Sequence, residues 1–71
     1  MDAKEELKIT LDKIKTHGFQ IREEWLDGGG GECEIRGKKV FFSDQTLPLP
    51  ERLEQAAAAL NALEARIMRN A

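Results

Sequence analysis

A chain of 71 residues is short enough to form one domain spanning residues 1–71, and its 41% hydrophobic content is sufficient for a folded core. Its net charge of −2 counts against general nucleic-acid binding, which needs a basic surface. One cysteine, a charged start without a secretory pattern and no long apolar run together predict a cytoplasmic protein that is not inserted in a membrane.

Residues 2–17 are predicted to form the first helix. Asp2 followed by Glu5 is similar to a capping box, in which a side chain satisfies a free N–H of the first turn. Gly18 stands where a helix commonly ends in a left-handed residue. An apolar stripe at helical spacing indicates the buried face: Ala3, Leu7, Leu11 and Ile14.

Residues 19–26 are predicted to form the first strand, because Phe19, Ile21 and Trp25 alternate with polar residues. The glycine run 28–31 follows as a mobile connection. A phosphate-binding loop would open a helix and would usually supply Lys-Ser or Lys-Thr. Here an acidic strand follows instead, so a connection is favoured over a ligand site. Neighbouring carboxylates keep a weak cation-binding alternative open: Glu23, Glu24, Asp27, Glu32 and Glu34.

Residues 32–43 are predicted to form a β-hairpin, in which two alternating runs flank a short turn that contains Gly37. With a Gly37-Lys38 turn, Ile35 faces Val40 and Cys33 faces Phe42. These four side chains are then expected to point into the core, with Cys33 buried and slow to react with thiol reagents. Phe41 would lie on the solvent face.

The last helix is predicted to run from Leu49 or Pro50 to about residue 69, because proline is tolerated in a first helical turn. One apolar stripe is expected to pack on the sheet: Leu53, Ala56, Ala57, Leu60, Leu63 and Ile67. A second stripe, made of small side chains, remains on roughly the opposite side: Ala58, Ala62 and Ala65.

These elements predict an α+β fold in the order αβββα. Three short strands and two helices cannot bury both faces of a sheet. We therefore expect a two-layer sandwich, in which a three-stranded antiparallel meander carries both helices on one face.

The sequence offers no combination of nucleophile, base and orienting group. Cys33 and His17 do not have the ligand spacing of a zinc site, and each has a simpler structural explanation. Cys33 fits the inward face of its strand, and His17 suits a helix C-terminus. We expect no catalytic residue, no cofactor and no metal, and hence no enzyme.

The chain resembles small bacterial proteins of unassigned function over nearly its whole length. The shared features are the glycine after the first helix, the Gly-rich loop before the Cys33 strand, the Gly-Lys turn and the Pro50-Glu51-Arg52 helix start. It is more distantly similar to the segment around the zinc helix of ImmA/IrrE-type metallopeptidases. That helix carries His-Glu-x-x-His, whereas residues 55–60 here read Gln-Ala-Ala-Ala-Ala-Leu. The resemblance therefore implies shape, and it does not imply peptidase activity.

The leading functional hypothesis is a small non-enzymatic interaction or regulatory module that binds a protein partner. The chain is also a candidate for a weak homodimer. Its expected interaction surface is Phe41, Arg36, Lys38, Lys39, Ala58, Ala62 and Ala65. One alternative is a nucleic-acid-binding accessory domain that uses the basic hairpin tip. Another is a small ligand or ion carrier with its site at the Gly-rich loop.

Overall fold

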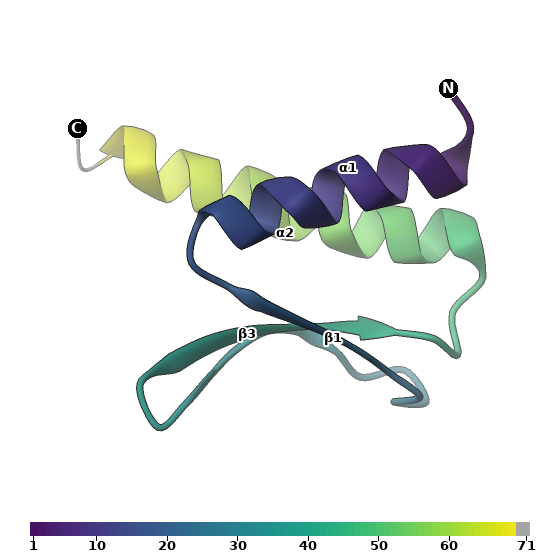
Figure 1. Cartoon of the computed structure of the whole chain (residues 1–71), viewed down its shortest axis with the longest axis horizontal. Coiled ribbons are helices and arrows are strands. Elements are labelled where there is room, and N and C mark those ends of the chain that lie inside the picture. The colour runs from purple at the N-terminus through teal and green to yellow at the C-terminus, as the bar shows by residue number, and fades with distance from the viewer. Residues whose placement is uncertain (70–71) are drawn as a thin grey trace.

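The structure is a computed structural model, and it describes residues 1–69. Its five elements follow the predicted order (Figure 1): α1 (Ala3–Thr16), β1 (Gln20–Glu24), β2 (Gly31–Ile35), β3 (Lys38–Asp44) and α2 (Leu49–Arg69). Figure 1 shows both helices on one face of the sheet. The α+β class and the placement of both helices in one layer are therefore confirmed.

Helix α1 begins and ends as its sequence predicts. The side chain of Asp2 accepts a hydrogen bond of 2.8 Å from the Glu5 N–H. At the other end the His17 N–H bonds to the Ile14 carbonyl, and Gly18 then adopts a φ of +88°. Glycine has no Cβ and enters this left-handed region without strain, so the chain can turn sharply from α1 into β1.

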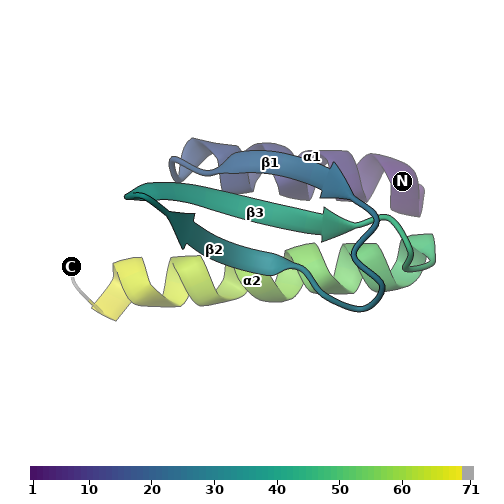
Figure 2. The same cartoon turned by 90° about the horizontal axis from the view of Figure 1, so that it is seen from below.

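The strand order is β1-β3-β2, so the predicted antiparallel meander is wrong. Strand β1 runs parallel to β3, and β2 runs antiparallel to it. Figure 2 shows β3 between the other two strands. The connection from β1 to β2 must therefore cross the end of β3. A pattern of residues along one strand carries no information about this crossing, because alternation reports faces and not neighbours.

The hairpin turn lies at Arg36-Gly37, one residue before the predicted position. Arg36 and Gly37 have φ values of +53° and +80°, as a type I′ turn requires, and this turn matches the twist of the strands. Cys33 therefore pairs with Val40 instead of Phe42, and Ile35 pairs with Lys38 instead of Val40. A two-residue change of partner leaves the faces of the hairpin intact, so the predicted grouping of its apolar side chains survives.

The orientation of that group is reversed. Phe41 is 1% exposed and packs in the core, so its predicted position on the solvent face is wrong. Cys33 was predicted to be buried and is exposed. The pairing of Phe41 with Ile21 of β1 explains the reversal, because both then face the helices together with Phe19.

The core lies between the sheet and the helices. On α2 it contains Ala56, Leu60 and Leu63, as predicted, with Leu53 packed at its margin. Ile67 continues the same stripe but is 53% exposed, because it lies toward the end of α2 that extends past α1 (Figure 1). The buried stripe therefore ends earlier than its sequence pattern does.

Candidate functional site

The outer face of the sheet is the most unusual surface of the described chain. Within residues 1–69 no helix or strand covers it, and Figure 2 is seen from this side. The hairpin directs its apolar side chains there, and we call this set the outer patch: Cys33, Ile35, Val40 and Phe42. An antiparallel sheet with one solvated face usually carries polar residues on that face. Here four apolar side chains of the hairpin lie on the solvated face, although Phe41 of β3 faces the core.

The side chains of the outer patch differ in exposure. Cys33 is exposed, Ile35 is 43% exposed and Phe42 is half-buried, whereas Val40 is covered by its neighbours. Arg22 of β1 is paired with Phe42, and its guanidinium carbon lies 5.8 Å from the centre of that ring. This cation–π contact places a charge beside the apolar surface. Trp25 directly follows β1 and is 78% exposed.

The helix-facing side of the hairpin carries charged residues beside the buried Phe41. One nitrogen of Arg66, on α2, donates to both carboxylate oxygens of Glu32 at 2.8 Å. The ammonium of Lys39 lies 5.8 Å from the centre of the Phe19 ring. These contacts tie the hairpin to the helix layer and hold Glu32 and Lys39 on the side away from the outer patch, whereas Lys38, paired with Ile35, lies on the outer side.

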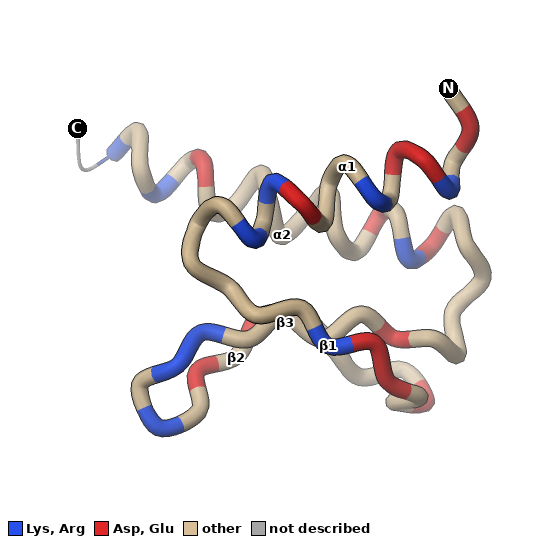
Figure 3. Tube along the Cα trace, in the orientation of Figure 1, with Lys and Arg blue, Asp and Glu red and all other residues tan. Residues whose placement is uncertain are grey.

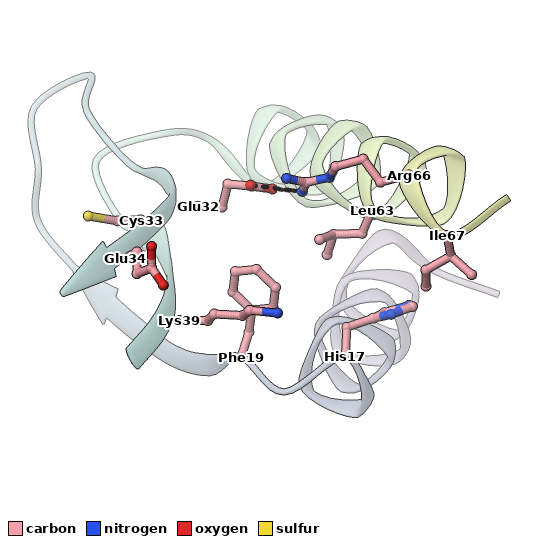
Figure 4. A pocket seen from close by; sticks show the side chains of 9 residues that line it. All are labelled: His17, Phe19, Glu32, Cys33, Glu34, Lys39, Leu63, Arg66 and Ile67. Carbon is pink, nitrogen blue, oxygen red and sulfur yellow. Dashed lines mark hydrogen bonds and ion pairs between the residues drawn. The ribbon is translucent and has the colours of Figure 1, made fainter. Parts of the chain in front are cut away.

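A groove of about 560 Å³ opens between the hairpin and the last turns of the two helices. Figure 4 shows Phe19, Leu63 and Ile67 around it, with the Arg66–Glu32 pair along one side. Cys33 borders this groove, but Figure 4 shows its sulfur atom pointing away from the groove centre. His17 borders the same groove, but because the Cys33 sulfur points away from it, the two side chains do not meet as a nucleophile and a base (Figure 4).

The connection between β1 and β2 is held by a buried carboxylate that the sequence analysis did not single out. Asp44, at the end of β3, is fully buried and accepts hydrogen bonds from the backbone N–H groups of Leu26 and Gly28 at 3.1 and 2.8 Å. It also accepts bonds from the Thr46 N–H and hydroxyl at 2.9 and 2.7 Å. The Asp-x-Thr pattern typical of an Asx turn could have revealed this site.

These hydrogen bonds determine the ionisation of Asp44. Burial alone would raise the pKa of this carboxyl, because it disfavours the charged form. The bonds from Thr46, Leu26 and Gly28 stabilise the carboxylate and outweigh burial, so the pKa falls to about 2. Asp44 is therefore a charged group at neutral pH, and its hydrogen-bond donors are groups of its own chain.

The glycine run is shaped by close approach to the rest of the fold. Gly30 has a φ of +106°, and a Cβ there would lie 2.9 Å from the Phe42 carbonyl and from the Gln55 side-chain nitrogen. The same Gln55 nitrogen bonds to the Gly29 carbonyl at 3.4 Å. Two N–H groups that a phosphate would need, those of Leu26 and Gly28, already donate to Asp44. The loop therefore packs as a crossing segment.

The residues of the expected interaction surface do not form one surface. Phe41 is buried in the core. Arg36 and Lys38 are exposed at the hairpin tip, which Figure 3 shows as a basic segment, but Lys39 lies against Phe19 on the helix-facing side. The alanines of the second stripe are exposed along α2, away from the sheet: Ala58, Ala62 and Ala65. A homodimer through this stripe stays a prediction.

Two general features complete the description of the site. Neither helix within residues 1–69 is long and apolar enough to cross a bilayer. Among the same residues, no group of three or more His, Cys, Asp or Glu side chains lies close enough to hold a metal ion.

Comparison of the chain with protein-family models, with curated proteins and with solved structures gives no match.

Proposed function

We propose that this chain is a non-enzymatic protein-interaction module that binds a protein partner through the outer patch. The observation that supports the proposal is the group of apolar hairpin side chains on the uncovered face of the sheet. The charged hairpin residues Glu32 and Lys39 face the helices, while Ile35 and Phe42 face solvent. Exposing apolar side chains loses the free energy that their burial would supply. A partner that covers the face would recover it.

The composition of the surface suits protein recognition. Interfaces are enriched in aromatic residues and arginine, and their energetic centre is commonly a few such side chains inside a polar rim. Phe42 with Arg22 over its ring supplies both types at the middle of the sheet.

The test uses two matched charge insertions. Ile35→Glu places a carboxylate in the outer patch, and Ile9→Glu does the same on α1, outside the patch. The two isoleucines have similar exposures of 43% and 40%, so both variants are expected to fold and melt like the parent. Tagged parent and variants are used to capture proteins from the native host extract, and the captured proteins are quantified by mass spectrometry.

The expected result is a partner that the parent and Ile9→Glu retain and that Ile35→Glu loses by roughly tenfold or more. The recovered partner is then purified, and its binding to the three chains is measured directly by calorimetry. Equal retention by all three chains, or no specific partner in the native extract, would contradict a binding role for this face.

A further inference from the structure

The free edge of β1 offers backbone hydrogen bonds. The Gln45 N–H donates to the Glu24 carbonyl at 2.8 Å, and Glu24 is paired with Asp44. In a parallel ladder, alternate residues direct both backbone groups to the neighbouring strand. Gln20, Arg22 and Glu24 therefore face β3. The N–H and C=O groups of Ile21 and Glu23 point to the open edge.

The same two residues line a groove of about 490 Å³ between β1, α1 and the start of α2. Its apolar lining comes from Ile21, from Leu7 and Leu11 on α1, and from Leu49 at the start of α2. Leu7 is buried at the base, whereas Ile21, Leu11 and Leu49 are only partly buried. Free backbone groups and partly exposed apolar side chains thus lie along one edge of the sheet. This combination is the arrangement to which an extended peptide binds by adding a strand.

The rim of this groove is basic, although the chain as a whole has a net charge of −2. Four cationic side chains line it against two carboxylates, those of Asp12 and Glu23: Lys4, Lys8, Lys15 and Arg52. The three lysines lie on one flank of α1, and Figure 3 shows basic positions recurring along that helix. Arg52 is held in place by hydrogen bonds of 3.0 Å to the Leu47 carbonyl and the Gln45 side chain.

We propose that this groove binds an extended, acidic peptide segment of a partner protein, which adds to β1 as a fourth strand. The backbone of the segment bonds to Ile21 and Glu23, and its carboxylates approach the lysines of α1. Charge complementarity selects the acidic partner, and the free edge selects an extended conformation. This surface is separate from the outer patch, since its side chains face the helix layer.

The first experiment uses a blocked nine-residue peptide in which glutamate and valine alternate, titrated into isotopically labelled parent protein. NMR shifts are expected at β1 and along the groove flank of α1, together with slower amide exchange at Ile21 and Glu23. The counterpart with lysine in place of glutamate is expected not to bind. Equal binding of both peptides, or no shifts with either, would overturn the proposal.

A matched pair of variants tests the basic rim. Lys8→Glu reverses one charge in the groove, and Lys13→Glu makes the same change on α1 at an exposed position that does not line the groove. Circular dichroism establishes that both variants fold. Lys8→Glu is expected to weaken binding of the glutamate peptide roughly tenfold, and Lys13→Glu less than about twofold. Equal weakening by the two variants would overturn the assignment of binding to the groove, because the position of the charge would then make no difference.

The added strand has its own control. Peptides are made in which either the glutamate amides or the valine amides are N-methylated, because methylation removes hydrogen-bond donors without changing charge. Only one alternate set of amides in an added strand faces β1. One methylated peptide should therefore lose binding while the other retains it. Equal affinities of the two methylated peptides would overturn the strand geometry.

Discussion

The Asp44 carboxylate accepts a hydrogen bond of 2.8 Å from the backbone N–H of Gly28, and this bond fastens the β1–β2 connection to the end of β3. The connection has to cross that end because β3 lies between β1 and β2. A glycine-rich segment can approach closely, and a carboxylate can accept several N–H groups at once. The unusual strand order and the buried acid are therefore parts of one arrangement.

Replacing this acid tests the arrangement. Asp44→Asn keeps the shape of the side chain but supplies only one acceptor oxygen, and its amide group would face the N–H donors of the loop. We expect a lower melting temperature and faster amide exchange at Leu26 and Gly28. Thr46→Val is the milder comparison, because it removes one hydroxyl donor to Asp44 and leaves the carboxylate in place. Unchanged exchange at Gly28 in Asp44→Asn would contradict the role assigned to this carboxylate.

The lowered pKa of Asp44 predicts a pH dependence of stability. The carboxyl has a pKa of about 2 in the folded chain, against 3.8 for an unperturbed group. Between these values the unfolded chain binds more protons, so stability falls as pH falls through the window. The contribution is fully present above the unperturbed pKa. Urea unfolding of the parent and of Asp44→Asn across this window isolates the contribution of Asp44 to the free energy of unfolding. The other carboxyl groups are present in both proteins, so their contributions cancel. A parent–variant difference that does not shrink toward pH 2 would contradict the assignment.

Leu60 is expected to contribute strongly to stability. It is buried in the core between α2 and the sheet, so Leu60→Ala should lower the free energy of unfolding by about 2–5 kcal/mol. Ile67→Ala is the matched control on the same stripe. Ile67 is 53% exposed, and its truncation should change stability by about 0.5 kcal/mol or less. Chemical denaturation measures both, and equal effects would mean that the stripe packs differently.

Cys33 reports the orientation of the hairpin directly. It is the only cysteine of the chain and lies exposed in the outer patch. We expect a chromogenic disulfide reagent to label the native protein at a rate close to that in denaturant. Cys33→Ser provides the blank. Labelling slowed by several orders of magnitude in the native state would show that this face is covered in solution, whether by the chain or by a second copy.

The exposed alanines of α2 predict weak self-association. Small side chains allow a second helix to approach closely, although each alanine buries little area. We expect the parent to form a dimer only at high concentration, and Ala62→Glu to remain monomeric. Analytical ultracentrifugation over a wide concentration range measures this. A dimer that is indifferent to Ala62→Glu would assign association to another surface, for which Ile35→Glu then serves as the probe.

Local signals predicted the elements well. The Asp2 cap, the Gly18 turn and the apolar stripe of α2 act within a few residues of one another, and the structure has both helices where these signals place them. The grouping of the hairpin side chains was also predictable, because alternation fixes which residues share a face. A positive φ at Arg36 was not predictable from a Gly-Lys pair, and it moved the turn by one residue.

The candidate surfaces depended on information that no local pattern contains. Which face of the hairpin turns toward the helices depends on which of its side chains lie beside Ile21. The pairing of Phe41 with Ile21 decides this orientation. The free edge of β1 follows from the strand order, which sequence patterning leaves open. Both proposed binding surfaces therefore required the tertiary arrangement, whereas Asp44 could have been recognised from its turn motif.

The strand order also sets the order in which the sheet assembles. Hairpin partners are close along the chain, whereas each residue of β1 pairs with one twenty positions later. Closing the longer loop costs more conformational entropy, so contacts of this kind form later in folding. We expect the hairpin to form first and β1 to dock afterwards. By the same reasoning β1 separates first when the sheet opens. A segment bound along the edge of β1 would therefore lower the rate at which the domain unfolds.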